Sequence, residues 1–397
     1  MKNLRLLLGI LIIFAVSGSV VFAQDVSAML ESYSRNFEKS DINAKLVLIE
    51  DAAKQNKEGL APLFKQAVDY AVNVSFQGMD VSVLRQICLV ALNQIEAFGY
   101  QDARGSVWKL FMKDVDSNIR IQSLKALSVA GKGDRELAGF VNEWLAGQNT
   151  IFKSGRKPNN TVIAQCVITL GALDQDSSFT VVFNTMTTGY SNDIEALCKN
   201  VLINLNGEFK QLLLDVINQG TMLERREALD VALESKKLGE PDKGEIAETA
   251  FEVALKLASK FTEENREIRQ MRLNALRALS ECKRSSATPL VLHYFQMIHD
   301  DYAKNVANKT ELIDCIRGLA NMGNNESAVR LSSYLDELNI FTEKKKVYDE
   351  QIVIEVVQAL GRMQDKVAFD YLMRVKFLNY SNNVRSAADE AIKNLKW

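Results

Sequence analysis

The chain repeats one short pattern along most of its length. Three stretches, beginning at Asp116, Ser191 and Ser381, share the same spacing of a polar turn, an apolar residue and small residues before a leucine or isoleucine. This last residue, the anchor, recurs at Leu92, Leu127, Leu170, Leu202, Leu233, Leu279, Leu319, Leu360 and Ile392. Eight intervals cover 300 residues, so the mean period is 37.5 residues, with a weaker first copy near Leu48. Such a period is the signature of a repeat architecture, in which each copy packs mainly against its neighbours.

Small and apolar residues stand at fixed distances before each anchor. The position one before is mostly small, as at Ala126 and Ala278, and the position eight before is mostly apolar, as at Ile119. Together with the position four before, these residues draw one stripe along a helix. Arg225 and Glu311 occupy the apolar position in two copies, where the pattern is weaker.

A second helical stretch lies between successive anchors. These stretches cover residues 137–145, 179–186, 209–217, 246–261, 289–298, 327–338 and 367–378. Each period is therefore two helices and two turns, and we predict an all-α protein. Only four prolines in 397 residues agree with long helices rather than many short strands.

The pattern resembles the HEAT-repeat family of armadillo-type α-solenoids. Ile119-Arg120 and Val384-Arg385 match the family's Val-Arg pair, and a small residue and then an Ala-Leu-like pair follow at the family's spacing. The resemblance implies a right-handed α-solenoid superhelix of about nine to ten helical hairpins with a long concave wall. The family's arginine is present at Arg85, Arg120, Arg226, Arg272 and Arg385, and other residues replace it at Ile163, Glu195, Leu312 and Val353. For these arginines the resemblance implies bonds to acidic groups or to backbone in adjacent repeats, in preference to a ladder that binds anions.

The first 23 residues are typical of an export signal. Lys2 and Arg5 precede an apolar run over 6–16, and Val21-Phe22-Ala23 supplies small residues for a cleavage site. The run is shorter than the ~20 residues that span a bilayer, which disfavours a retained anchor. We expect cleavage near Ala23–Gln24, a single continuous solenoid over 24–397, a periplasmic or secreted location in a bacterium, and no stable membrane insertion after cleavage.

The charge balance disfavours a nucleic-acid partner. Lysine and arginine total 48 against 50 acids, a net charge of −2, whereas nucleic-acid binding needs a basic excess or stripe. We therefore expect no nucleic-acid partner.

Few residues carry recognisable chemistry. His293 and His299 lie about 240° apart around a helix, so they do not form an i, i+4 metal pair. The fragment Asp114-x-Asp116-x-Asn118 lacks the glycine and the final glutamate of a calcium loop, and we interpret it as a turn that caps the next helix. The sequence has no nucleophile elbow, phosphate loop or metalloprotease motif. We predict that the chain is not an enzyme, with no catalytic residue, metal or cofactor.

Four of the five cysteines share one column of the repeat. Cys88, Cys166, Cys198 and Cys315 all stand four residues before an anchor, and Cys282 lies outside the column. Equivalent positions in neighbouring repeats lie about 10 Å apart, beyond the ~7 Å limit on the Cα separation of a disulfide. We expect buried free thiols.

Two intervals between anchors are longer than the others. They contain residues 147–160 and 236–244, which are rich in Gly, Lys, Asn or Pro. We interpret both segments as projecting loops.

The exposed face of the anchor helices is expected two, five and nine residues before each anchor. In the C-terminal half these nine positions are all polar, and we call them the polar ladder: Gln270, Asn274, Arg277, Thr310, Asp314, Arg317, Gln351, Glu355 and Gln358. A merely solvated face explains the same pattern. The contiguous hydrogen-bonding groups also fit a groove for a partner, and these nine residues are our candidate partner-binding site.

Three functions remain open. A scaffold that binds a protein or peptide on the concave wall follows from a repeated framework without a catalytic constellation, and we favour it. A structural subunit of an envelope-associated complex is the second. A lyase or cofactor-attachment enzyme is the third, because some helical-repeat families are enzymes.

Overall fold

A computed structural model describes residues 26–74, 80–257, 266–344, 346 and 348–396. The predicted signal peptide, residues 1–23, lies outside these residues. Within them the chain forms α-helices, short 3₁₀ turns and one isolated β-bridge between Asp365 and Lys396, but no β-strand. The protein is an all-α solenoid, as the sequence predicts. It divides into two compact units, the first ending at Gly207 and the second beginning at Glu208.

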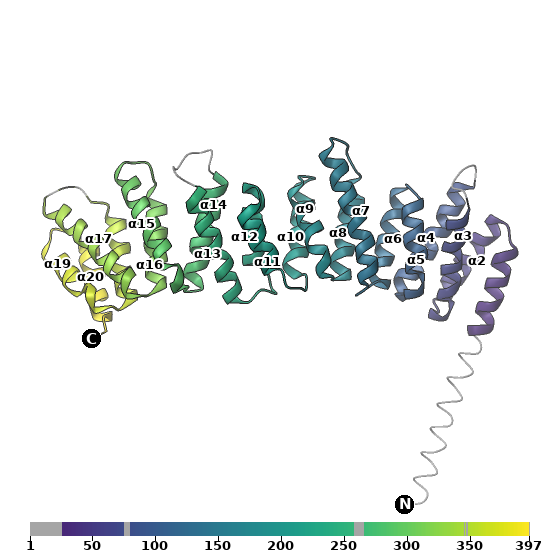
Figure 1. Cartoon of the computed structure of the whole chain (residues 1–397). Helices are drawn as coiled ribbons and strands as arrows, with labels where there is room; N and C mark the ends of the chain where they lie inside the picture. The colour runs from purple at the N-terminus through teal and green to yellow at the C-terminus, as the bar shows by residue number, and fades with distance from the viewer. Residues whose placement is uncertain (1–25, 75–79, 258–265, 345, 347, 397) are drawn as a thin grey trace, which may run out of the picture. The chain divides into compact units, whose positions relative to one another are not determined.

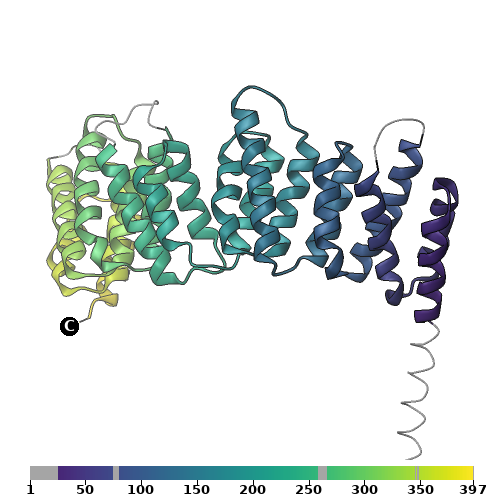
Figure 2. The same cartoon turned by 45° about the vertical axis from the view of Figure 1, so that its right-hand side comes forward.

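The first unit stacks helical hairpins in two layers (Figures 1 and 2). After helical residues 26–39, its α-helices are α2 (Ile42–Gln55), α3 (Ala61–Asn73), α4 (Val81–Phe98), α5 (Arg104–Lys113), α6 (Ser117–Ala130), α7 (Arg135–Lys153), α8 (Asn160–Leu173), α9 (Phe179–Thr187) and α10 (Asn192–Asn204). The even-numbered helices pack in the order α2, α4, α6, α8, α10, while α3 packs on α5 and α7 on α9 in the other layer. Each anchor lies on an even-numbered helix.

The second unit has the same two-layer arrangement within itself. Its helices are α11 (Lys210–Gln219), α12 (Met222–Glu234), α13 (Glu240–Leu257), α14 (Arg266–Glu281), α15 (Thr288–Ala303), α16 (Lys309–Met322), α17 (Asn325–Glu343), α18 (Glu350–Met363), α19 (Phe369–Phe377) and α20 (Asn382–Asn394). Helices α12, α14, α16, α18 and α20 form one layer, and α11, α13, α15, α17 and α19 form the other. The handedness of the predicted superhelix, its concave wall and the single continuous solenoid stay predictions.

The repeated polar turn of the sequence is the N-cap of the even-numbered helices. The carboxylate of Asp116 accepts the backbone N–H groups of Asn118 and Ile119 at 2.9 and 3.2 Å, and the hydroxyls of Ser191 and Ser381 accept N–H groups in the same way. These bonds satisfy amides that would otherwise lack a partner in the first helical turn. Residues 114–118 therefore form a capping turn, as expected.

The stripe predicted from the spacing is the core of both units. Cys88, Cys166, Cys198 and Cys315 are all 0% exposed, and so are Ala126 and Ile119. Small residues on this stripe let successive helices approach closely: a Cβ on Gly318 of α16 would lie 2.8 Å from Leu276 Cδ1 on α14. The equal depth of the four cysteines supports the predicted register of the repeats.

The two exceptions to the apolar column are accommodated differently. Glu311 is buried and forms an ion pair with Arg269 on the preceding even-numbered helix. Arg225 is partly exposed, and its guanidinium donates to the backbone carbonyls of Gly220 and Asn218 at 2.7 and 2.9 Å. A charged residue in this column is therefore tolerated where a neighbour supplies a partner.

The predicted projecting loops are shorter than expected, and this part of the sequence analysis was wrong. Helix α7 continues to Lys153, so only 154–159 of the segment 147–160 joins two helices, and α13 begins at Glu240, within the segment 236–244. Asn149 explains the extension of α7, because its buried amide donates to the Thr185 hydroxyl on α9 at 3.0 Å. Pro241 stands in the first turn of α13, where the missing N–H costs nothing.

Helix α4 is, within the described chain, the one helix long and apolar enough to cross a membrane. Its apolar side chains, among them Leu84, Ile87 and Leu92, are buried against α2, α3 and α6. It is therefore a core helix of the solenoid.

Candidate partner-binding face

The nine residues of the polar ladder lie on three successive helices of one layer. Each of α14, α16 and α18 carries three of them, and these helices pack in that order. Six are exposed, Asn274 and Asp314 are partly exposed, and Glu355 is buried. The structure thus brings the predicted residues together, except that Glu355 faces its neighbours rather than solvent.

Ion pairs connect consecutive helices along the ladder. Arg277 Nη2 on α14 donates to Asp314 Oδ2 on α16 at 3.0 Å, and Arg317 Nη2 on α16 donates to Glu355 Oε2 on α18 at 2.7 Å. The arginine side chains are 57% and 53% exposed, whereas the Asp314 and Glu355 side chains are 14% and 9% exposed. In both pairs a shielded carboxylate therefore holds an exposed guanidinium.

Glu355 has a second arginine partner that the sequence analysis missed. Arg362 Nη2, from the same helix, donates to Glu355 Oε1 at 3.0 Å. Burial alone would raise the pKa of the Glu355 carboxyl, but the hydrogen bonds from Arg317 and Arg362 outweigh it and lower that pKa below its ordinary value. The carboxylate is therefore ionised at neutral pH. Arg362 stands two residues after an anchor, outside the three positions that define the ladder.

The N-terminal end of the ladder is held by amide hydrogen bonds. Gln270 Nε2 donates to Asn274 Oδ1 at 2.9 Å, and Asn274 Nδ2 donates to Asp230 Oδ1 on α12 at 3.0 Å. By contrast, the side chains of Thr310, Gln351 and Gln358 are exposed and make no hydrogen bond to the described part of the chain. These three side chains keep their donors and acceptors available.

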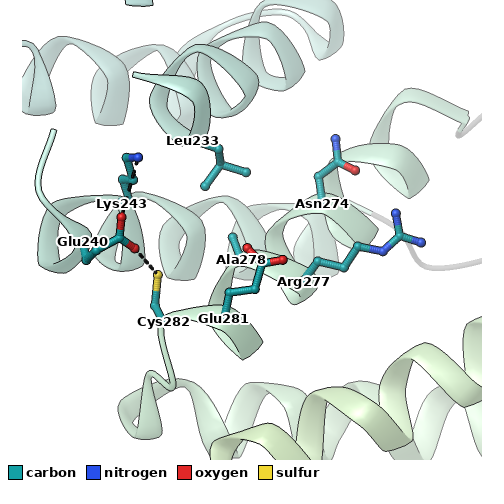
Figure 3. Close-up of a pocket in the computed structure, with 8 residues that line it drawn as sticks. All are labelled: Leu233, Glu240, Lys243, Asn274, Arg277, Ala278, Glu281 and Cys282. Carbon is teal, nitrogen blue, oxygen red and sulfur yellow. Dashed lines mark hydrogen bonds and ion pairs between the residues drawn. The ribbon is translucent and has the colours of Figure 1, made fainter. Parts of the chain in front are cut away.

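A cleft opens beside the ladder where α12, α13 and α14 meet. It encloses about 290 Å³, and Asn274, Arg277 and Ala278 line it from α14 while Leu233 lines it from α12 (Figure 3). The small side chain of Ala278, in the column one before the anchor, leaves this space open. A single side chain of a partner fits a volume of this size.

The far wall of the cleft carries Cys282, the one cysteine that is not fully buried. Its Sγ lies 3.4 Å from Glu240 Oε2, and Figure 3 shows Glu240 between Cys282 and Lys243. Burial, and then the hydrogen bond to Glu240, raise the pKa of the Cys282 thiol. A raised pKa keeps the group as a thiol rather than the nucleophilic thiolate.

The arginines of the repeated arginine column lie outside the ladder and make contacts within the fold. Arg85 Nη2 donates to Asp114 Oδ1 at 2.8 Å, and Arg120 Nε donates to the Asp114 backbone carbonyl at 2.8 Å. Arg226 pairs with Glu267 at 2.8 Å, and Arg272 is buried with its guanidinium 5.0 Å from the Tyr294 ring. Arg385 donates to the Asn382 side chain at 3.2 Å. The contacts of Arg85, Arg120 and Arg226 match the structural role that the resemblance implies, whereas the contacts given for Arg272 and Arg385 are to an aromatic ring and to a side-chain amide.

The histidines do not lie at the ladder. Both are on α15, where His293 is exposed and His299 lies against Asp300 and Glu337. The described residues contain no group of three or more His, Cys, Asp and Glu side chains that could hold a metal ion. All five cysteines are free thiols.

Comparison with known proteins finds similarity to solved structures alone. No protein-family model matches the chain. No curated protein matches it either. A solved structure described as a "circular tandem repeat protein with novel repeat topology and enhanced subunit contact surfaces" aligns at 16% identity, over 93% of this chain and 76% of that chain, with a TM-score of 0.16. With so low a TM-score, this likeness bears on neither the shape nor the function of the chain.

Proposed function

We propose that this chain is a non-enzymatic scaffold of the bacterial cell envelope that binds a protein or peptide along the polar ladder. The pairs Arg277–Asp314 and Arg317–Glu355 carry the proposal. In each pair, a shielded carboxylate holds an exposed guanidinium in place. A guanidinium has five N–H donors, and only some of them bond within the fold. An arginine held in this way loses little conformational entropy when it binds, which is typical of the residues that dominate interfaces.

The partner meets a periodic row of hydrogen-bonding groups. Thr310, Gln351 and Gln358 belong to the same row, and their side chains make no hydrogen bond to the residues that the structure describes. The cleft next to Arg277 offers room for a side chain. Such a row suits the backbone carbonyls and acidic side chains of a peptide segment. Its acids and arginines are balanced, which fits a protein partner better than a polyanion.

The location in the envelope rests on the N-terminal sequence. Lys2, Arg5, the apolar run and Val21-Phe22-Ala23 have the order of a cleaved export signal. N-terminal sequencing of the protein from a periplasmic or culture fraction tests this proposal. We expect a chain that begins at Gln24; a cytoplasmic chain that retains Met1 would contradict it.

We also propose that the repeats are HEAT repeats rather than generic helical hairpins. The support is the arginine column, in which Arg85 and Arg120 both bond to Asp114 at the turn between α5 and α6.

Charge reversal tests the binding function. We expect the double variant Arg277→Glu and Arg317→Glu to lose partners that co-purify with the wild-type protein. Arg135→Glu is the matched control, because Arg135 is an exposed, weakly paired arginine of the first unit. An unchanged set of partners in the double variant would refute the proposal. A screen of the purified protein for hydrolase activity, bound chromophore and metal tests its non-enzymatic part.

A second candidate is a structural subunit of an envelope-associated complex. Exposed apolar side chains on α5 and α7 favour it: Met112 and Phe140 are exposed, and Phe140 stacks on Trp108 with 6.2 Å between ring centroids. If this surface makes a fixed contact, Phe140→Ser will release the protein from a large sedimenting complex, while the double arginine variant will not.

A further inference from the structure

A second pocket, which we call the aromatic pocket, lies in the second unit and shares no residue with the polar ladder. It encloses about 360 Å³ between α15, α17 and the start of α18, and none of the nine ladder residues lines it. Five rings line it, those of Tyr302, Tyr334, Phe341, Tyr348 and His299, together with the carboxylates of Glu337 and Asp349. These residues come from three separate segments, so no sequence motif marks the pocket.

The rings are held in place by their neighbours. Tyr334 is buried and packs edge-on against Phe295 and His299, with centroid distances of 5.4 and 5.1 Å. Tyr348 packs edge-on against Tyr380 at 4.9 Å, and its hydroxyl accepts the Ser381 N–H at 3.0 Å. The walls are therefore organised before any ligand enters.

The lining carries two carboxylates and the imidazole of His299, and it contains no lysine or arginine. Asp349 is fixed as the N-cap of α18, where it accepts the N–H groups of Gln351 and Ile352 at 3.1 and 3.4 Å, and it also pairs with Lys309. Glu337 is half-exposed, and its Oε2 lies 3.1 Å from His299 Nε2. Aromatic faces beside carboxylates attract cations.

Two further cations of the chain contact residues that line the pocket. Lys346 Nζ is 5.2 Å from the centroid of the Phe341 ring, and Arg330 Nη1 lies 3.4 Å from Glu337 Oε1. The first distance is within the ~6 Å range of a cation–π interaction. Neither cation lines the pocket. The groups of this wall thus already interact with an ammonium and a guanidinium in the structure.

From this geometry we propose that the aromatic pocket binds an organic ammonium group. A volume of about 360 Å³ lies at the small end of ligand pockets and accommodates one lysine side chain or one small quaternary amine. The rings surround the methylene or methyl groups, and Glu337 balances the positive charge. The proposal does not rest on partner binding by the ladder, since the two sites share no residue.

Paired cationic and neutral probes test the proposal on the mature protein. Choline is compared with its neutral isostere 3,3-dimethylbutan-1-ol, and N-acetyl-lysine methylamide with N-acetyl-norleucine methylamide, by calorimetry and saturation-transfer NMR. We expect at least one cationic probe to bind about tenfold more tightly than its neutral isostere, the order expected of a partly desolvated cation–π site. Binding of choline alone identifies a free amine as the ligand, and binding of the lysine probe alone identifies a peptide side chain.

Two variants locate the binding in this pocket. Glu337→Gln removes the charge and Phe341→Leu removes a ring, and each should weaken the cationic probe about fivefold or more. Glu326→Gln, on the same helix α17, and Phe377→Leu, an exposed ring on α19, are the matched controls and should leave binding unchanged. Circular dichroism confirms that each variant is folded. Equal affinity for charged and neutral probes, no binding of either cation, or equal loss in the controls would overturn the proposal.

Discussion

Arg317 and Glu355 join two neighbouring repeats through an ion pair of 2.7 Å in which the arginine is half-exposed and the carboxylate is buried. Arg277 and Asp314 repeat this relationship one period earlier at 3.0 Å. The face of α14, α16 and α18 is therefore ordered by its own side chains. A face that is merely solvated would not need ion pairs between its helices, because exposed ion pairs contribute little to stability.

Neutralising Glu355 should weaken both the fold and the proposed binding. In Glu355→Gln the two arginines lose their charged partner but remain accessible to water, so we expect a loss of about 1–2 kcal/mol in the free energy of unfolding, less than for a fully buried pair. Urea denaturation measures this loss, and Glu326→Gln is the control with no expected change. A variant as stable as the wild type would mean that the pair does not order this face.

Asp114 should be the more important acid for stability. Its side chain is 1% exposed and accepts Nε and Nη2 of Arg85 at 3.1 and 2.8 Å. Asp114→Ala should cost about 3 kcal/mol, as for other broken buried pairs. Asp69→Ala, which removes an exposed i, i+4 pair with Lys65, should cost less than about 0.5 kcal/mol. Equal losses in the two variants would contradict the assignment of Asp114 as a structural anchor.

Acid should destabilise the first unit through the same residue. Burial alone would raise the pKa of Asp114, but the bonds from Arg85 and from backbone N–H groups lower it below its ordinary value. A lowered folded-state pKa means that the stabilisation is complete above the unfolded value of about 3.9 and is lost as the pH falls through the folded value. Thermal unfolding between about pH 5 and pH 2 should therefore show a smaller loss of stability in Asp114→Asn than in the wild type. Parallel curves would show that Asp114 does not titrate in this way.

A charge in the small-residue column should disrupt the packing of successive helices. Ala126→Glu places a carboxylate at a fully buried position between helices and should cost several kcal/mol. Ala278→Glu should cost less, because Ala278 lines a cleft through which the carboxylate can reach water. The control is Ala146→Glu at an exposed position of α7. A normal melting temperature for Ala126→Glu would contradict the packing described for α6.

The five thiols should react in two classes. Burial raises the pKa of Cys88 and of Cys198 to about 12, and it also raises the pKa of Cys166 and Cys315. At pH 8 a thiol reagent should therefore modify only Cys282, slowly, until denaturant exposes the other four. Cys282→Ser should abolish the reaction of the native protein. Rapid reaction of two or more thiols without denaturant would show that the column is not core.

The repeating core could be predicted from the sequence because the same spacing of small and apolar residues recurs before successive anchors. The column of Cys88, Cys166, Cys198 and Cys315 is buried because each residue has the same neighbours in its own repeat. The length of α7 could not be predicted in this way, because the bond from Asn149 to Thr185 joins residues 36 positions apart on two helices.

The polar ladder was predictable as a face, but its internal pairing was not. Spacing places Arg317 and Glu355 on the outer sides of their helices, whereas the contact between them depends on the separation and rotation of two repeats. Glu355 is buried at that contact, and Arg362 also forms an ion pair with it. Arg362 does not stand at any of the repeated positions, so the pattern does not predict this second pair. The aromatic pocket could not be predicted for a related reason, because Tyr302, Tyr334 and Tyr348 come together only in the folded chain.

Site-specific photocrosslinking in intact cells tests the proposed partner face most directly. A photoreactive residue is placed at Gln351 or Gln358 on the ladder, and at Glu326 on α17 as the control. The proposed scaffold function predicts that both ladder positions give the same discrete adduct with a second protein and that Glu326 does not. No adduct at either ladder position, or the same adducts at all three positions, would contradict the polar ladder as the partner-binding face.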